Sequence, residues 1–547
     1  MFFRQKKSGD RTYLQIVENR WEGGGSKQRV ICTLGRLDEL EASGQLERLI
    51  SSGARYSESM MVIDAHSRGD APVMAVRRIG PGLIFERLWR DTGLKEVIEG
   101  LCAPRKFEFP MERAVFVTVL NRLFAAGSDR FCNRWIQDYG ISGVDELDLH
   151  HLYRAMAWLG EELPEAQQAG RTLSPRCVKD LIEEDFFFRS RDMFSSLDLV
   201  FFDTTSIYFE GEGGDTLGER GHTKDHRPDL KQMVVGAVID NQGRPICCEM
   251  WPGNTADVTS LVPVVDRLRS RFSIGRVCIV ADRGMISANT IEELEKRNWP
   301  YILGARMRRV KEVKGEVLSR AGRYQKVKAS RSSLKVKEVR VNERRYVVCV
   351  NEDQAKKDAL DRAAIIAALE ERLKQGDKSL VGNKGFRRYL AATGSTFAVD
   401  HDKAKAESRF DGKWVLRTNT TLSASEVALK YKQLWMVEHL FRSAKTLLST
   451  RPVYHKYDRT IRGHVFCSFL ALVLRNALQE RLEAKEISCE WADIKLDLDN
   501  LTEVELEHGG KRFVLRSQPK GVCNAVFRAA GVAFPPTIRN VPFDVTE

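Results

Sequence analysis

The spacing of apolar residues divides the chain into regions of different secondary structure. Residues 1–45 alternate between apolar and polar positions, which predicts short strands joined at a glycine-rich turn near residues 23–26. Between residues 80 and 190 the apolar positions recur with helical spacing. From residue 197 onward, short apolar runs alternate with helical stretches, which is typical of an α/β fold. We expect strands at 197–203, 232–240, 245–251, 275–281, 301–304 and 414–419, and helices at 254–270, 287–297, 356–374, 423–448 and 461–482.

This pattern predicts six regions along the 547 residues. A small β-rich region, 1–75, is followed by a helical region, 76–195, which is expected to recognise DNA if the protein does so. Two α/β segments, 196–304 and 412–482, form one core, which a basic and mainly β insertion, 305–411, interrupts. Residues 483–547 form a C-terminal region with weak patterning. A chain of this length is long enough for several domains with buried cores of their own.

Positive charge is concentrated in the predicted insertion. The chain has 87 Lys and Arg against 75 Asp and Glu, a net charge of +12, and residues 305–350 alone hold fifteen basic against four acidic side chains. Such a segment favours a polyanionic partner, because Lys and Arg neutralise phosphates. The most apolar stretch, 465–474, has ten residues, about half of what a membrane span needs, so no membrane partner is expected. The eleven cysteines include no C-x-x-C pair, which is typical of reduced thiols in the cytoplasm.

Three carboxylates stand where metal ligands are expected. Asp203 and Asp282 each end an apolar strand, and Glu438 lies on the long helix that follows the last strand. Carboxylates gathered at strand ends can hold Mg²⁺, because this hard cation prefers oxygen ligands. Taken singly, each of the three also suits an ordinary strand end or an exposed helix position.

The predicted helix around Glu438 places several polar residues on one face. Tyr431, Glu438 and Lys445 step by seven residues, so a continuous α-helix presents them together. Arg442, one turn after Glu438, is spaced for an i,i+4 ion pair. The same spacing also suits an amphipathic helix without a catalytic role.

These residues resemble the signature of bacterial insertion-sequence transposases of the DDE type. Tyr431, Glu438 and Lys445 match the family pattern Y-(2)-R-(3)-E-(6)-K, and Leu434 stands where the pattern has Arg. Further segments resemble the family in the same order along residues 195–470: the strand end Asp203-Thr-Thr, the segments 221–230 and 252–257, the unit Asp282-Arg-Gly and the strand 414–419.

The segment 221–230 also permits a second interpretation. His222, Asp225, His226 and Asp229 together are similar to a set of zinc ligands, but no Cys accompanies them and Pro228 argues against a helix. We therefore expect a structural or DNA-facing loop.

The resemblance to the DDE family implies a fold and a reaction. The implied fold is an RNase H-like core, a mixed five-stranded sheet flanked by helices, in which Asp203, Asp282 and Glu438 bind two Mg²⁺ ions, with Mn²⁺ as a possible substitute. The implied function is that of a DNA transposase, which cleaves the phosphodiester at insertion-sequence ends by two-metal hydrolysis and joins the 3′-hydroxyl to target DNA. The implied partners are inverted-repeat DNA, target DNA and a second copy of the chain in a homodimer. The implied location is the bacterial cytoplasm, at the nucleoid when DNA is bound.

The candidate DNA contacts lie in the insertion and on the signature helix. Between Asp282 and Glu438 lie 155 residues, and related transposases carry a largely β insertion there that contacts transposon-end DNA. The basic segment 305–350 fits that role. The candidate contacts are Tyr431, Arg442, Lys445, Arg306, Arg308, Arg309 and Lys311.

Two other functions remain open from the sequence. An RNase H-like nuclease would cut DNA without strand transfer, and a catalytically silent relic would bind DNA without cutting it. The presence of all three carboxylates argues against the relic.

Overall fold

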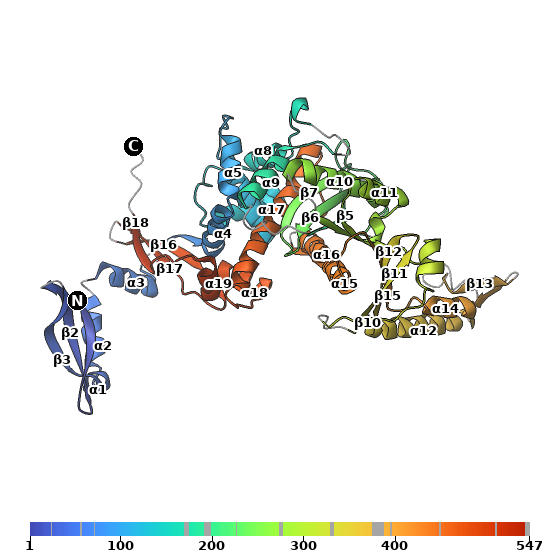
Figure 1. Ribbon diagram of the computed structural model, residues 1–547. Helices are drawn as coiled ribbons and strands as arrows, with labels where there is room; N and C mark the ends of the chain where they lie inside the picture. The colour runs from blue at the N-terminus through green and yellow to red at the C-terminus, as the bar shows by residue number, and fades with distance from the viewer. Residues whose placement is uncertain are drawn as a thin grey trace.

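A nine-stranded sheet forms the centre of the computed structural model (Figure 1). Its strand order is β10-β11-β12-β15-β9-β8-β5-β6-β7, so the protein is mixed α/β. The structure describes residues 1–541 except 23–24, 55–56, 71, 169–173, 191–198, 226, 273–276, 329–332, 375–387, 394–395, 448–449 and 509–510.

Five neighbouring strands form one half of this sheet. They are β7 (Pro245–Pro252), β6 (Gln232–Asp240), β5 (Leu199–Tyr208), β8 (Cys278–Ala281) and β9 (Tyr301–Ala305). The strands β5, β8 and β9 are parallel, whereas β6 and β7 run antiparallel to their neighbours. Nearly all of their residues are buried, as expected for strands that are covered on both faces. The sequence predicted all five.

The other half of the sheet comes largely from the basic insertion. Antiparallel to β9 lies β15 (Lys413–Thr418), followed by β12 (Arg344–Asn351), β11 (Leu334–Val341) and β10 (Gln325–Lys326). The sheet is therefore larger than the five strands predicted for the core, because β15 pairs with the free edge of the core at β9 and the insertion strands continue the sheet from β15. The insertion also contains α12 (Glu352–Lys374), β13 (Leu390–Thr393), β14 (Thr396–Val399) and α14 (His401–Ser408).

Helices cover both faces of the five-stranded half. One face packs against α10 (Asp257–Phe272) and α11 (Ala288–Lys296), and the other against α15 (Ala424–Lys432), α16 (Trp435–Arg442) and α17 (Asp458–Glu483). Alternate residues of β5 point to opposite faces, so that Phe201 and Ile207 join the α15–α17 core while Val200 and Phe202 join the α10–α11 core.

The continuous helix predicted for 423–448 is wrong. The backbone forms a turn at Gln433 and Leu434, where the N–H groups of Met436 and Val437 bond to carbonyls three residues back, and a π-helical turn, Ser443–Leu447, follows α16. Residues 433 and 434 keep right-handed helical dihedrals, so the break is a local tightening of the helix. No Pro or Gly in the sequence indicates it. Because the helix is interrupted, Tyr431, Glu438 and Lys445 do not lie on one face of a single regular helix.

Six helices after residue 79 share one core with the long helix α17, and α4, α6 and α8 among them pack directly against it. Gly463 of α17 lies so close to the backbone of Met156 that a Cβ atom would collide there, which explains the small residue at this crossing. By length and composition α17 could cross a membrane, but 83% of its most apolar window is buried in the protein, and a buried core helix passes the same test. The six helices are α4 (Gly80–Asp91), α5 (Leu94–Cys102), α6 (Met111–Ala125), α7 (Asp129–Trp135), α8 (Leu149–Leu159) and α9 (Val178–Arg189).

The chain ends form two further sheets. An antiparallel sheet of β1 (Phe2–Ser8), β2 (Arg11–Glu22) and β3 (Gly25–Arg36) projects from the rest of the protein (Figure 1). A second sheet joins β4 (Val73–Arg78) to the C-terminal strands β16 (Thr502–His508), β17 (Lys511–Arg516) and β18 (Ile538–Val541). The remaining helices are α1 (Leu37–Ala42), α2 (Gln45–Ala54), α3 (Glu58–Arg68), α18 (Trp491–Asp499) and α19 (Cys523–Ala530).

Candidate active site

Asp203 and Asp282 lie side by side at the sheet. Strands β5 and β8 are parallel, and Phe202 is in register with Ala281, so the next residue along each chain segment is a carboxylate. Asp282 directly follows β8, as predicted, whereas β5 continues to Tyr208, so the prediction that Asp203 ends its strand is wrong. Asp203 alternates in phase with Phe201 on the face that α15–α17 cover, and Asp282 is in phase with Val280 on the same face. The structure therefore brings these two predicted residues together.

The Asp203 side chain is half-buried and has no cationic partner among the described residues. It accepts a hydrogen bond from the backbone N–H of Thr204 at 2.7 Å, and no ion pair to it occurs among the described residues. The pKa of Asp203 is raised to about 6, chiefly by desolvation of the carboxylate, and smaller contributions from the charges of Asp282 and Asp257 act in the same direction. Lys224 and the backbone N–H of Thr204 act in the opposite direction. A cation at this position would relieve that unfavourable burial of negative charge.

Tyr431 connects α15 to Asp282. Its hydroxyl donates to Oδ1 of Asp282 at 2.8 Å and lies directly over Gly304 of β9, where any Cβ atom would collide with it. Burial, reinforced by the negative charge of Asp282, raises the pKa of the phenol, so it remains a hydrogen-bond donor. The predicted Tyr431 thus contacts a carboxylate of the site in this DNA-free structure.

Glu438 lies on α16, which packs against β5 and β6. Leu434 and Phe441, one helical turn before and after it, are buried, whereas Glu438 is exposed. No hydrogen bond or ion pair to its carboxylate occurs in the described part of the chain. Glu438 is thus a free carboxylate on the helix that covers the face to which Asp203 and Asp282 point.

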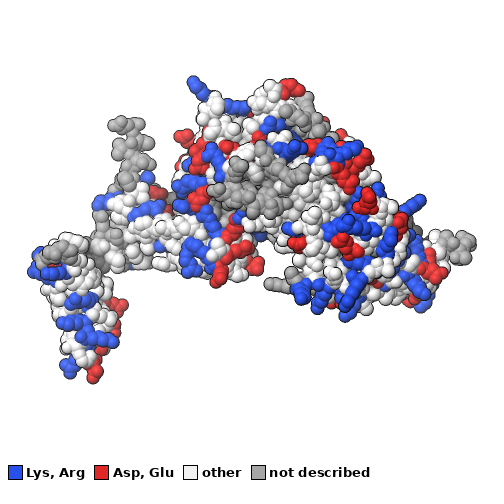
Figure 2. All heavy atoms as spheres, viewed as in Figure 1, with Lys and Arg blue, Asp and Glu red and all other residues white. Residues whose placement is uncertain are grey.

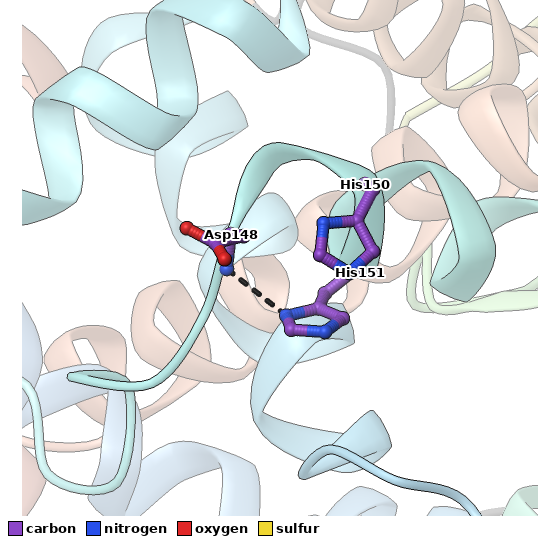
Figure 3. A group of neighbouring side chains, drawn as sticks. All are labelled: Asp148, His150 and His151. Carbon is purple, nitrogen blue, oxygen red and sulfur yellow. Dashed lines mark hydrogen bonds between the residues drawn. The ribbon is translucent and has the colours of Figure 1, made fainter.

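The three carboxylates are not gathered around one point as closely as the ligands of a single bound ion. Among the described residues, only Asp148, His150 and His151 place three potential ligand atoms within 4.8 Å of one another. Figure 3 shows His151 turned back to Asp148, whose backbone N–H donates to Nδ1 at 3.0 Å. The Asp148 carboxylate in turn accepts the backbone N–H of His151. This reciprocal pair caps the start of α8, so helix capping accounts for the cluster.

Lys445 is held by the buried carboxylate of Asp225, which the sequence named only as one of the zinc-like residues. Its Nζ lies 2.7 Å from Oδ1 of Asp225, and an Nη of Arg451 lies 2.6 Å from the same atom. The Asp225 side chain is 5% exposed, and its second oxygen is buried without a partner. Burial lowers the pKa of Lys445, while Asp225 acts in the opposite direction. No sequence pattern reveals this pairing, because 220 residues separate its members.

The adjacent Lys224 joins the same loop to the sheet. Its Nζ donates to the backbone oxygen of Thr204 at 2.7 Å and lies 3.1 Å from Oδ2 of Asp257, which begins α10. Of the zinc-like residues, Asp229 pairs with Arg227, and His226 lies outside the described residues. The expected structural loop therefore ties the strand of Asp203 to the segment that follows Glu438.

The basic candidates of the insertion divide into paired and exposed side chains. Arg306 donates to the backbone oxygens of Arg283 and Gly284, directly after Asp282, and Arg308 pairs with Glu407. Arg309 and Lys311, also in the insertion, are exposed, as is Arg442 at the end of α16. Figure 2 shows Lys and Arg gathered along the lower edge of the lobe that β10–β12 and α12 form.

Residues 195–474, just over half of the chain, match the family model described as the Transposase DDE domain. Residues 3–65 match the N-terminal domain of the IS1634 family transposases. The chain belongs to the DDE-type insertion-sequence transposases. No curated protein matches this transposase.

Two solved structures are also similar to this transposase. A piggyBac transposase synaptic complex with hairpin DNA is 10% identical, with 77% of this chain and 79% of that chain covered and a TM-score of 0.35. The Mos1 transposase paired-end complex with the left transposon end is 14% identical, with 36% and 60% covered and a TM-score of 0.15. These scores are low, and family membership rests on the two family models.

Proposed function

We propose that this transposase cleaves the phosphodiester at the ends of its insertion sequence and joins the resulting 3′-hydroxyl to target DNA at a divalent-metal site formed by Asp203, Asp282 and Glu438. The observation that carries the proposal is the pair of carboxylates on adjacent parallel strands, Asp203 within β5 and Asp282 directly after β8, of which the half-buried Asp203 has no cationic partner among the described residues. The order β7-β6-β5-β8-β9, with the last three strands parallel, supports an RNase H-like core around them.

The donor set fits hard divalent cations. All three side chains offer carboxylate oxygens, and none of them has a Lys or Arg partner among the described residues. Mg²⁺, or Mn²⁺ in its place, would supply Lewis-acid stabilisation of the phosphoryl oxygens and lower the pKa of the attacking water. Asp203 and Asp282 would hold the metal from the sheet, and Glu438 from the covering helix.

Other residues of the chain position these ligands. The Tyr431 hydroxyl orients the Asp282 carboxylate, and Arg306 holds the insertion against the turn that follows Asp282. Asp225 fixes Lys445, whose cation is thereby available close to the site as a contact for a DNA phosphate. Exposed basic side chains of the insertion then supply affinity for transposon-end DNA that does not depend on sequence. In this proposal two copies of the chain bridge two transposon ends as a homodimer, in the cytoplasm of a bacterium.

The test is cleavage of a duplex that carries the inverted repeat flanking the coding region. We expect wild-type protein with Mg²⁺ to nick the repeat and to join it to a target plasmid, and Asp203→Asn, Asp282→Asn and Glu438→Gln to lose at least about a thousandfold in rate, since each of them removes a ligand charge. Glu292→Gln, an exposed residue of α11, is the matched control.

Each other outcome contradicts a defined part of the proposal. Cleavage without joined product would identify a nuclease, and binding without cleavage by the wild type would identify a silent relic. Full activity in one of the three variants would exclude that residue as a ligand. Activity that persists in EDTA would exclude the metal site.

A further inference from the structure

A cavity of about 490 Å³ lies between the start of α7, helix α8 and the segment before α17. It is lined in part by Arg451, which pairs with Asp225. Three tyrosines line it, and they are unusually uncovered for aromatic side chains: Tyr454 is 66% exposed, Tyr457 62% and Tyr153 40%. The ring of Tyr153 contacts that of His455 edge to face, whereas Tyr454 and Tyr457 make no ring contact within the described residues and so offer stacking surfaces to a ligand.

The deeper part of the cavity is polar and contains an unsatisfied donor. Arg122 is 2% exposed, yet its Nε has no hydrogen-bond partner, while an Nη donates to Nδ1 of His464 at 2.8 Å. Because the Nη of Arg122 is always a donor, Nδ1 of His464 is an acceptor. Nε2 of His455, 3.1 Å from that same Nδ1, therefore donates to it.

This hydrogen-bond pattern fixes the chemistry that the cavity offers to a ligand. A neutral His455 with its proton on Nε2 keeps Nδ1 as an acceptor, and burial lowers the pKa values of both histidines, which favours the neutral form. Asp129, 4% exposed, adds a carboxylate 3.5 Å from His455. The cavity thus combines aromatic rings with a free N–H donor and nearby acceptors, which suits the edge and faces of a planar heterocycle. A bare phosphate would fit poorly, because Asp129 would repel it.

Shared contacts connect the cavity to the region of the carboxylates. Arg451 at its rim pairs with Asp225, which also holds Lys445. Val453 bonds to the backbone at the end of β5, the strand that carries Asp203. Phe209 lies six positions after Asp203, which is about 20 Å along a strand, or about six nucleotides of B-form DNA. Lys456, exposed at the same rim, can contact a phosphate of that DNA.

We propose that this cavity binds one unstacked nucleobase of the DNA strand that leaves the carboxylate site, with Tyr454 and Tyr457 stacking on the base, Arg122 and His455 meeting its edge, and Arg451 and Lys456 contacting the neighbouring phosphates. The proposal rests on the proposed function, since it takes the strand at the carboxylates as its ligand. It adds a contact to a base, which the carboxylates and the insertion do not provide.

The experiment measures DNA binding by the full chain in the Asp203→Asn background without divalent metal, so that no cleavage occurs. The probe is the transposon-end duplex with a single-stranded extension, and a single abasic site is moved along it one position at a time. We expect one position, within about six nucleotides of the cleavage site, at which loss of the base weakens binding about tenfold to a hundredfold.

A double-mutant comparison assigns that loss to the cavity. Tyr454→Ala with Tyr457→Ala should weaken binding of the intact probe to the same extent and should cause no further loss at the sensitive abasic position. Tyr454→Phe with Tyr457→Phe should bind like the wild type, because the rings remain. Leu496→Ala, an exposed apolar residue of α18, is the control.

Three results would overturn the proposal. The first is equal binding at every abasic position, or no DNA binding at all. The second is a loss caused by the alanine variant that simply adds to the abasic effect. The third is unchanged DNA binding with an altered oligomeric state, which would assign the cavity to a second copy of the chain. Cleavage is tested separately with Mg²⁺. This distinguishes failure of the present proposal from failure of the proposed function, because the effect of the abasic site on binding can be present or absent whether or not the protein cleaves DNA.

Discussion

Two groups of charged residues lie within the α/β core, and they are built in opposite ways. Between α9, α10 and β7, Arg271 contacts Asp180 at 3.0 Å, Glu183 at 2.6 Å and Glu249 at 3.2 Å, and Lys179 contacts Asp180 at 2.8 Å. All five side chains are almost completely buried, and every carboxylate has a cationic partner.

The second group is Asp203, Asp282 and Glu438. These carboxylates have no ion pair in the described part of the chain, although Asp203 is half-buried. A buried charge without a partner weakens a fold, whereas a paired and hydrogen-bonded one can be retained. The contrast indicates that the paired network joins elements of the fold, while the unpaired carboxylates are kept for a ligand.

Removing the central cation of the paired network should have the largest effect on stability. Arg271→Ala leaves three buried carboxylates without their shared partner and should lower the free energy of unfolding by about 3–5 kcal/mol. Urea denaturation monitored by circular dichroism measures the loss. Arg269→Ala, an exposed neighbour on α10, should change it by less than about 0.5 kcal/mol. Equal effects of the two variants would remove the distinction between the groups.

Removing the charge of an unpaired carboxylate should instead raise the free energy of unfolding. The pKa of Asp203 in the fold, about 6, exceeds its ordinary value of 3.8, so its ionised form weakens the metal-free fold above about pH 6, and this penalty disappears as the pH falls toward 4. Asp203→Asn should therefore stabilise the metal-free protein by about 2–3 kcal/mol at pH 8 and by little at pH 4. Thermal unfolding at both pH values measures this. Destabilisation at pH 8 would mean that Asp203 has a cationic partner.

Asp225 shares features with both groups. Its carboxylate is buried and paired, but it contacts Lys445, the lysine of the family signature. Asp225→Asn should leave Lys445 and Arg451 without a shared carboxylate and should lower the cleavage rate about tenfold, which corresponds to about 1.4 kcal/mol. Asp229→Asn, in the same loop but exposed, should leave the rate unchanged. A lost rate in both variants would indicate a general effect of the loop.

The exposed cations of the insertion should have the smallest individual effects. Arg309→Glu with Lys311→Glu should weaken DNA binding and reduce the slope of log affinity against log salt concentration by about 1.8, if each residue contacts one phosphate. Fluorescence anisotropy at several salt concentrations measures the slope. An unchanged slope would place the phosphate contacts elsewhere.

The sequence predicted those parts of the fold that depend on local pattern. Strand β6 has the predicted limits, and Asp203 and Asp282 were found because each follows an apolar run. The break at Gln433 and Leu434 was missed, because both residues suit a helix and the tightening comes from packing on the sheet. The pairing of the insertion strand β12 with β15, and that of β4 with β16, join segments far apart in the sequence and have no local pattern.

The candidate site was predicted to a similar extent. The sequence identified the carboxylates, Tyr431 and Lys445 by their types and spacing, but not the partners of the last two. Tyr431 bonds to Asp282 across 149 residues and Lys445 to Asp225 across 220. Such contacts are properties of the folded chain. The cavity beside Arg122 was missed for the same reason, because it combines α6, α8 and the segment before α17.

The most direct test of the unpaired carboxylates is Mn²⁺ binding to the DNA-bound protein, measured by isothermal titration calorimetry. We expect the wild type and Glu292→Gln to bind Mn²⁺ with the same affinity, and Asp203→Asn with Asp282→Asn to bind it at least about a hundredfold more weakly, because two oxygen ligands lose their charge. Equal affinity in the double variant would contradict the account, since the unpaired carboxylates would then not be the metal site.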